Sequence, residues 1–547
     1  MFTSEKQGQR HVPALNNDRE NIFRDKSMPL YQQKPTGSSK TAKKINSMTP
    51  VMPTLKWICA VLLCCILSCA VGPNFERPQP PSIERYTTGA TPTETMPADG
   101  KAQHFEQGAR IVSDWWRLFN SPRLDAVVKE AIANNQNLQA AQASLRQSQD
   151  ILRAGYGVFY PQLNAGLEAS RQKASPALTG GTAPSSIFNL FTLASTVSYA
   201  LDVFGGERRA VESLGAQADF QHAVVLATYI TLSGNVVNAM IAQTGYQEQI
   251  KATEQLIDLQ REQVKLTEVR AQAGTVPYAN VLSLQSQLAS LEATLPPLRQ
   301  KISQTEHLLA TLAGHTPAEW APQQVELADL TLPGELPVTL PSQLVRQRPD
   351  ILAAEAQLHS ASAEIGVATA ALFPSFTLNG SYGVGSNTSH NLFKSNNSFW
   401  NLGANISAPL FHGGTLWFGR QAALDAYQLS LANYRQTVLS AFAQVADTLR
   451  ALEHDAELVN AQSHALSAAE EALRLIQANY QAGTANYVQV LVANGQYDQA
   501  KIGYLQALAQ RYQDTAALFV ALGGGWWNAE ENGTGAVSNK DSLLRSP

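Results

Sequence analysis

The sequence predicts an α+β membrane protein made of two copies of one unit, in which two membrane-length strands precede a hairpin of very long helices. Three observations support this fold class. Short motifs recur in the same order in the two halves of the 547-residue chain, four segments alternate between apolar and polar residues, and two long segments contain no proline. A period of two is typical of strands, and a long segment without proline is typical of a helix.

The internal duplication makes 121–315 and 342–525 equivalent halves. In the same register, Asn137–Ala141 aligns with Asp350–Ala354, Tyr160-Pro161 with Phe373-Pro374, Ala273-Gly274-Thr275 with Ala482-Gly483-Thr484, and Gly314 with Gly523. The proline-rich segment 316–341 between them predicts a linker. Because internal repeats determine the fold, each half is expected to contain the same helix, strand pair and helical hairpin.

Four segments predict strands: 161–173 and 191–203 in the first half, and 374–385 and 398–411 in the second. Each has about the ten residues that a tilted strand needs to cross a bilayer. Their alternating apolar residues are Leu163, Ala165, Leu167 and Ala169; Leu193, Val197, Tyr199 and Leu201; Phe376, Leu378, Tyr382 and Val384; and Trp400, Leu402, Ala404, Ile406 and Leu410. The residues between them are mostly polar or glycine, so each strand is expected to have one apolar and one polar face.

The long helices are predicted at 207–273 and 415–482, with return helices at 276–313 and 485–522. A helix of that length extends about 100 Å at 1.5 Å per residue, so these helices must pack along one another. The first return helix carries a heptad seam of leucine and isoleucine from Leu284 to Leu312, with Thr305 as a polar exception. Pro296-Pro297 is expected to kink it.

Four strands cannot close a barrel, and an open sheet edge in lipid costs several kcal/mol for each unsatisfied backbone group. Bacterial barrels have an even number of strands, eight or more. Side chains nearly fill an eight-stranded interior, whereas twelve strands can leave a lumen. If the chain forms a channel, this geometry favours a trimer whose helices continue the barrel as a coiled-coil tube.

The N-terminal segment 1–68 combines a polar stretch with an apolar run at 57–67, which has the length and flanks of a signal-peptide core. Ile66-Leu67-Ser68-Cys69 resembles a lipobox, so Cys69 is the predicted lipidation site; the alternative is an ordinary secretory signal. Residues 1–47 are polar, which favours Met48 or Met52 over Met1 as the initiator, the alternative being a long leader. The residue after the cysteine is Ala70 and not Asp, which resembles the signal for sorting of lipoproteins to the outer membrane of Gram-negative bacteria.

Composition excludes several classes of protein. Charged residues make up 15% of the chain and the net charge is −4, so nothing indicates a nucleic-acid partner. All four cysteines lie at or before Cys69, which excludes a disulfide framework, a cysteine metal site and a catalytic thiol in the body. No enzyme motif is present, and neither catalytic residues nor a metal site are predicted. The tail, 526–547, is expected to be disordered.

An ordered set of motifs resembles a known family. Cys69–Pro78, Trp115-Trp116 with Leu118-Phe119, Arg348–Ile351, Phe373-Pro374, Pro409–Phe411 and Tyr480–Gly483 occur in the order seen in the outer-membrane factor lipoproteins of tripartite efflux systems. These are the NodT-type members of the TolC-like and OprM-like outer-membrane efflux proteins. The resemblance extends from Cys69 to Gly525.

The resemblance implies a homotrimer with a twelve-stranded outer-membrane β-barrel, a periplasmic α-helical barrel, and an equatorial region formed by 316–341 and the terminal segments, including 69–120. It implies a passive exit duct in the outer membrane, held by a lipid on Cys69 and without any other cofactor. The exported small molecules, such as drugs, toxic organic compounds or metal ions, are delivered by a periplasmic adaptor and an inner-membrane transporter of the RND or a similar class. The sequence does not identify the exported substrate.

The turns between the long helices are expected to form the periplasmic tip and its gate. Glycines there allow the positive φ of a helix C-cap. By resemblance, Tyr480 matches a gate tyrosine, Val488 lies at a constriction, and Val492 replaces an aspartate that relatives often carry. The alternative for Tyr480 and Val492 is that they pack in the seam between helices and do not line the constriction. The predicted gate and tip residues are Tyr480, Gly483, Tyr487, Val488, Val492, Gly274, Thr275 and Tyr278.

Two other functions remain open from the sequence. The same duct could serve a type I protein secretion system, although the lipobox and the start of the mature chain resemble the efflux branch more closely. A coiled-coil lipoprotein without a pore would explain the heptads but not the four alternating strands.

Overall fold

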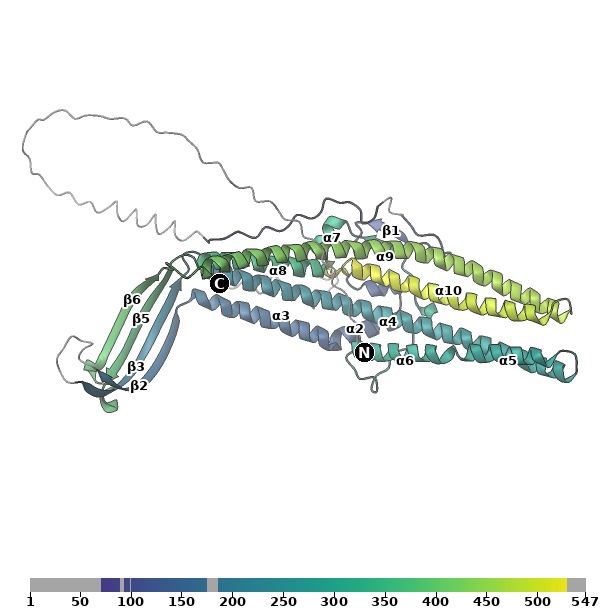
Figure 1. Ribbon diagram of the computed structural model, residues 1–547, viewed down its shortest axis with the longest axis horizontal. Helices are drawn as coiled ribbons and strands as arrows, with labels where there is room; N and C mark the ends of the chain where they lie inside the picture. The colour runs from purple at the N-terminus through teal and green to yellow at the C-terminus, as the bar shows by residue number, and fades with distance from the viewer. Residues whose placement is uncertain (1–69, 89–92, 99, 175–184, 529–547) are drawn as a thin grey trace, which may run out of the picture. The chain divides into compact units, whose positions relative to one another are not determined.

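The computed structural model describes residues 70–88, 93–98, 100–174 and 185–528, which all belong to one compact unit (Figure 1). Cys69, the N-terminal segment 1–68 and the tail beyond Asn528 lie outside the described residues. The tail was predicted to be disordered from 526, but its first residues are bound to the body. The Trp526 indole N–H donates to the carbonyl of Gln347 at 2.9 Å, and the Asn528 amide donates to the carbonyl of Ile111 at 2.7 Å.

Four antiparallel strands form one sheet in the order β2-β3-β5-β6. Their bounds are Gln162–Ala174, Ser186–Leu201, Ser375–Ser386 and Ser398–Ser407. β3 begins before the predicted position 191, and β6 ends before the predicted position 411. Pro409 explains the early end, because proline has no N–H to donate to the ladder. Leu410, predicted to belong to the alternating set, is therefore outside the sheet.

The strand register places the predicted apolar residues on one face of the sheet. Leu163 of β2 pairs with Val197 of β3, Tyr199 pairs with Leu378 of β5, and Phe376 pairs with Ile406 of β6. Directly paired residues point to the same side, so the apolar face is continuous across all four strands. The opposite face carries mainly Asn, Ser, Thr and Gly, as in the paired row Asn164, Thr196, Ser381 and Asn401.

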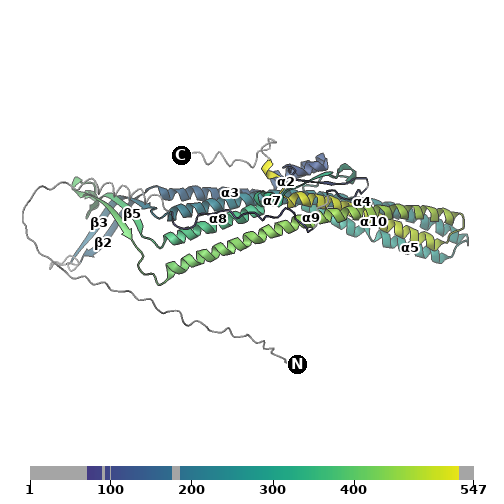
Figure 2. The same ribbon diagram turned by 90° about the horizontal axis from the view of Figure 1, so that it is seen from above.

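The long helices are α4, Gly206–Gln272, and α9, Thr415–Gln481, and each contains 67 residues. α10, Tyr487–Ala521, returns along α9, and Figures 1 and 2 show α5, Tyr278–Glu292, and α6, Leu295–Leu312, returning along α4. The shorter helices α3, Gln136–Gly155, and α8, Pro349–Ala370, precede the strand pairs and pack on α4, while α8 also packs on α9.

The first return helix is two helices rather than one. α5 ends at Glu292 and α6 begins at Leu295, so the interruption is a full break and not only the predicted kink. Pro296 and Pro297 cause it, because they lack the N–H groups that would continue the helix but are tolerated in the first turn of a new one. The heptad seam continues across the break, since Leu284 and Leu309 are both fully buried.

The region between the repeats packs into the protein rather than forming a simple linker. β4, Glu335–Val338, pairs in parallel with β1, His104–Gln107, from the N-terminal segment. Nearby are α2, Pro122–Asn134, α7, Pro341–Gln347, and the 3-10 helix η1, Trp115–Phe119. The buried aromatic residues of η1 anchor the main hydrophobic core, in which the rings of Trp115 and Phe519 stack at 5.3 Å. The same core includes buried residues of α4, α9 and α10, so this region packs against the long helices.

Arg348 connects the second repeat to this core. It is the residue before α8, and its guanidinium donates to the carbonyls of Ala441 and Ala521, to Gln444, and to Asp350 at 2.9 Å. These partners lie on α9, on α10 and at the start of α8 itself. The Arg-Pro-Asp motif therefore has a structural role, because it joins the start of one helix to two others.

Candidate functional site

The two turns between the long helices have the same construction. Gly274 has φ of 71° and Gly483 has φ of 77°, values that favour glycine. After each glycine, a threonine N–H donates back over the helix end, from Thr275 to Arg270 and from Thr484 to Asn479. This is the Schellman arrangement, in which the last carbonyls of a helix are satisfied by the turn. The predicted tip residues Gly274, Thr275 and Gly483 thus form the turns themselves.

The two predicted tyrosines of the second hairpin point inward, between the hairpins. Tyr487 is buried with Val264 and Leu284, and its ring lies 6.0 Å from that of Tyr480. Its hydroxyl has no hydrogen-bond partner among the described residues, and burial raises the pKa of Tyr487 far above its usual range. Within one chain, both tyrosines therefore pack the hairpins together.

Val488 and Val492 form a separate, outward-facing group. They lie one turn apart on α10, and 63% and 54% of their surfaces are exposed. Tyr278, at the start of α5, is also exposed. The eight predicted residues are thus divided among the turns, the inter-hairpin core and an exposed apolar face, so they do not form one cluster in a single chain.

Contacts between the two hairpins near the tip involve few charges. The amide of Asn494 on α10 donates to Gln263 on α4 at 2.9 Å, and farther along, Gln506 donates to Gln249 at 3.2 Å. No ion pair joins 260–292 to 471–499 in the structure. Neutral hydrogen bonds contribute only about 0.5–1.5 kcal/mol each. Little free energy is therefore needed to separate the two hairpins near the tip.

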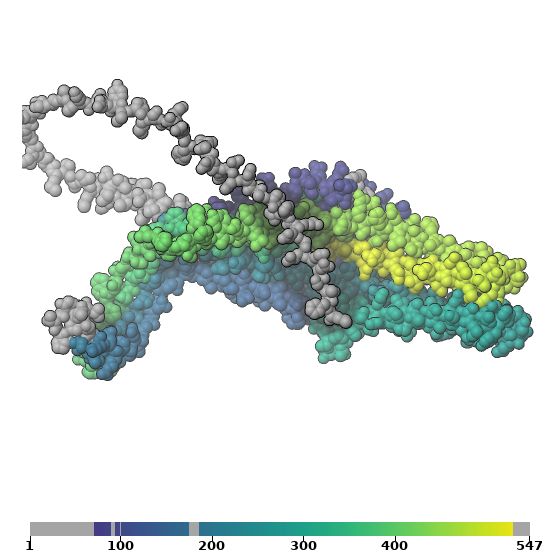
Figure 3. All heavy atoms as spheres, in the orientation of Figure 1, coloured from purple at the N-terminus to yellow at the C-terminus, as the bar shows by residue number. Residues whose placement is uncertain are grey.

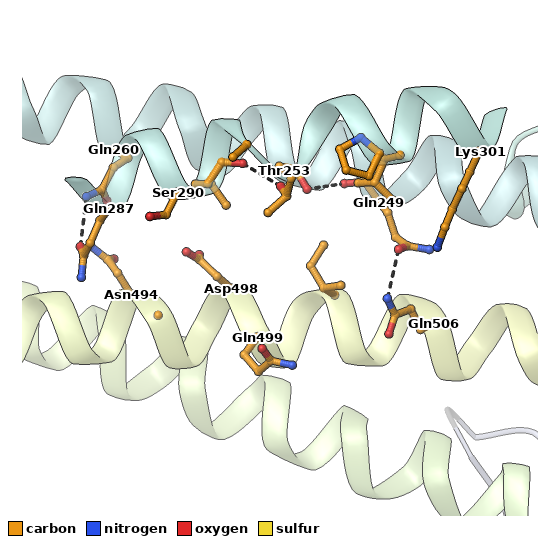
Figure 4. A pocket seen from close by; sticks show the side chains of 17 residues that line it. Gln249, Thr253, Gln260, Gln287, Ser290, Lys301, Asn494, Asp498, Gln499 and Gln506 are labelled. Atoms are coloured by element: carbon orange, nitrogen blue, oxygen red, sulfur yellow. Dashed lines mark hydrogen bonds between the residues drawn. The ribbon is translucent and has the colours of Figure 1, made fainter. Parts of the chain in front are cut away.

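A cavity of about 670 Å³ lies between α10 and the three helices α4, α5 and α6 (Figure 4). Most of its polar lining residues carry amides or hydroxyls, and Asp498 is the single carboxylate among them. Figure 3 shows the groove between the hairpins from outside, with α10 facing α5. Sequence reasoning missed Asp498, because a single aspartate in an amphipathic helix resembles any solvated position.

The residues that follow the predicted lipidation site are held at the junction between β3 and α4. The N–H of Val71 donates to the carbonyl of Phe204 at 3.0 Å, and Arg209 donates to Asn74 at 2.6 Å. Gly205 has φ of 78°, and a Cβ there would lie 2.6 Å from the Cα of Ala70. The described chain therefore begins, at Ala70, beside the base of the sheet.

Comparison with known proteins agrees with this architecture. The family described as "Outer membrane efflux protein" matches residues 127–315 and 340–524, one segment in each repeat. The pyoverdine export outer membrane protein OpmQ of Pseudomonas aeruginosa is 33% identical over 76% of this chain and 88% of its own length. Nodulation protein T of Rhizobium leguminosarum bv. viciae is 27% identical over 87% of this chain and 94% of its own length.

Solved structures show the same fold. The outer-membrane channel OprN matches with a TM-score of 0.76 and 28% identity, covering 84% of this chain and all of that one. The open state of the MtrE outer membrane channel of Neisseria gonorrhoeae matches with a TM-score of 0.72 and 27% identity, covering 84% of this chain and 98% of its own. The predicted fold class is confirmed. The chain belongs to the outer membrane efflux protein family, and it is an outer-membrane exit duct for efflux.

Proposed function

We propose that three copies of this chain form a twelve-stranded barrel that serves as the passive exit duct of a tripartite pump. A periplasmic adaptor and an inner-membrane transporter of the RND or a similar class deliver the cargo. The four-stranded sheet carries the proposal, because it has one apolar face, one polar face and two open edges. The apolar face suits lipid, and the polar face suits a water-filled lumen.

The open edges are the reason for expecting closure between copies. β2 and β6 each have a neighbour on one side only, and every residue of β6 is exposed. In lipid, each unpaired backbone group costs several kcal/mol, so β6 of one copy must pair with β2 of the next. Twelve strands leave room for a lumen, whereas eight are nearly filled by side chains.

The helical tip is the proposed gate. Val488 and Val492 from three copies supply an apolar ring around the axis, in place of a ring of carboxylates. Tyr480, Tyr487 and the Asn494–Gln263 hydrogen bond hold the second hairpin against the first in each copy. Opening separates the hairpins and breaks these few contacts, while Gly274, Thr275 and Gly483 keep the turns intact.

The proposed cargo is a small organic molecule. Relatives are named for the export of pyoverdine, toluene and antibiotics. Another relative is called a probable outer membrane lipoprotein, which supports a lipid on Cys69. We infer that this lipid holds the chain at the periplasmic face of the outer membrane. No observation on the described residues favours protein secretion.

The decisive experiment is reconstitution of the full chain. Purified protein should have the mass of a trimer by native mass spectrometry and should conduct ions across a planar bilayer. A monomer that does not conduct would contradict the duct and support the coiled-coil lipoprotein. For the anchor, cells labelled with a palmitate analogue should incorporate label into the wild-type chain but not into Cys69→Ala.

A further inference from the structure

The cavity beside Asp498 has the dimensions of a small-molecule site. Its volume of about 670 Å³ falls within the range of roughly 300–1,000 Å³ that is typical of ligand pockets. One wall is α10, with Asp498 and Ile502, and the opposite wall comes from α4, α5 and α6, with Thr253, Ser290 and Leu298. Figure 4 shows the Asp498 carboxylate directed from α10 across the cavity toward Ser290.

Asp498 is a half-buried carboxylate that forms no hydrogen bond or ion pair with any described residue. Burial raises its pKa to about 6, so it is mostly ionised at neutral pH. Other acids of these hairpins have partners: Glu292 binds Arg261 at 2.7 Å, and Glu254 binds Arg299 at 3.0 Å. A buried charge without a partner is unfavourable, and a bound cation would compensate it.

The positive group that lines the same cavity does not supply that partner. The Lys301 amine lies 5.2 Å from the centre of the Tyr246 ring, a cation–π geometry. Lys301 lies toward the opposite end of the cavity from Asp498 in Figure 4. The cavity is therefore polarised, with a negative end at Asp498 and a positive end at Lys301, and a ligand's cationic group would be oriented toward Asp498.

The rest of the lining indicates the chemical class of the ligand. Amide and hydroxyl groups at Gln287, Asn494 and Ser290 can accept hydrogen bonds from an ammonium, while Leu298 and Ile502 provide apolar surface. A divalent metal is a poor fit, because calcium takes six to eight oxygens and usually several carboxylates. No group of three or more His, Cys, Asp or Glu side chains suited to a metal occurs among the described residues.

We propose that this cavity binds a small organic ammonium ion, with the ammonium at Asp498 and the apolar body against Ile502 and Leu298. A ligand bound there contacts α10 on one side and α4 and α5 on the other. It therefore bridges the two hairpins of one chain, close to the Asn494–Gln263 hydrogen bond. Binding in this cavity does not depend on the proposed export through the lumen of the trimer.

The test uses the full chain in lipid nanodiscs and dansylcadaverine, a fluorescent primary amine with an apolar ring system. Its N-acetyl derivative, which lacks the charge, is the matched ligand control. Fluorescence anisotropy at pH 7.5 gives the Kd for wild type, for Asp498→Asn and for Asp258→Asn. Asp258 is an exposed acid of α4 outside the cavity, so its variant removes the same charge elsewhere.

We expect Asp498→Asn to weaken binding at least about tenfold and Asp258→Asn to leave it within about twofold. For wild type, affinity should fall between pH 7.5 and pH 5, because protonation of Asp498 removes the negative charge that faces the ligand. Lys301 is the other titratable residue in the lining. Ser290→Phe, which fills the cavity and keeps Asp498, should also abolish binding. Equal affinity in wild type and Asp498→Asn, or equal binding of the acetylated amine, would overturn the proposal.

Discussion

The guanidinium carbon of Arg270 lies 5.3 Å from the centre of the Tyr480 ring, which joins the last turn of α4 to the last turn of α9. Both residues directly precede the turns that form the tip. Both residues are partly buried, and a cation–π contact contributes about 0.5–1 kcal/mol where it is exposed and about 2 kcal/mol where it is desolvated, the same order as the neutral hydrogen bonds nearby. It therefore holds the hairpins together weakly enough to be broken during opening.

Loss of this contact should loosen the gate. We expect Arg270→Ala and Tyr480→Ala each to raise the resting conductance of single trimers in planar bilayers, because the hairpins separate more readily. Arg261→Ala is the matched control, since Arg261 pairs with Asp258 and Glu292 inside the first hairpin. A control variant that opens as readily as the other two would show that the effect is general destabilisation.

Placing a carboxylate at Val492 should change ion selectivity. In a trimer, Val492→Asp puts three negative charges around the proposed constriction, so the reversal potential in a salt gradient should shift toward cation selectivity. The shift should shrink at high ionic strength because salt screens exposed charges. Leu259→Asp, an exposed position on α4, adds the same charge elsewhere. Unchanged selectivity in Val492→Asp would place this residue away from the pore.

Trp115 should be essential for the stability of the equatorial core. It is 1% exposed and its ring stacks on Phe519 at an interplanar angle of 11°. Replacing a buried aromatic residue with alanine costs about 3–5 kcal/mol, so Trp115→Ala should markedly lower the midpoint of denaturant unfolding. Leu118→Ala, on the same 3-10 helix but 39% exposed, should have a much smaller effect. Similar shifts for both variants would contradict this account of the core.

Asp455 should make stability depend on pH. Burial, and then the neighbouring Asp514, raise the pKa of this α9 carboxyl above its usual range, to about 7. The folded chain therefore holds a proton that the unfolded chain releases, so stability falls as pH rises from about 4 through about 7. Asp455→Asn should flatten this fall in Tm and stabilise the protein at pH 8.

The exposed Asp447 of the same helix provides the control for this measurement. Asp447→Asn should retain the wild-type dependence of Tm on pH, because it removes a carboxyl of the same helix and leaves Asp455 and Asp514 in place. If Asp455→Asn also retained the full slope between pH 5 and pH 8, another group would be responsible for it.

Sequence periodicity predicted local structure well where the same spacing of apolar residues repeats over many residues. Alternation at Leu378 and Tyr382 identified a strand face, and the leucine seam from Leu284 to Leu309 identified a helix face. Glycine after each long helix identified the turns, because a positive φ favours glycine. These features depend on neighbours along the chain, so they are visible without knowing the fold.

Contacts between distant segments do not follow from local pattern. The resemblance placed 316–341 and 69–120 in one equatorial region, but the pairing of β4 with β1, more than two hundred residues earlier, is evident only in the structure. Tyr480 and Tyr487 were both predicted at the gate or tip, but only the structure shows that both turn inward within one chain. Asp498 has no motif, and its lack of a partner is evident only once the facing walls of α4 and α5 are in place.

Local periodicity and ordered motifs were enough to identify the two-fold repeat, the four two-faced strands, the long hairpins and the family. The structure was needed to show which faces meet: the apolar face shared by four strands, the contacts between hairpins and the cavity at Asp498. The physical reason is that periodicity specifies the side of an element on which a side chain lies. Burial and pairing depend on the element that packs against that side.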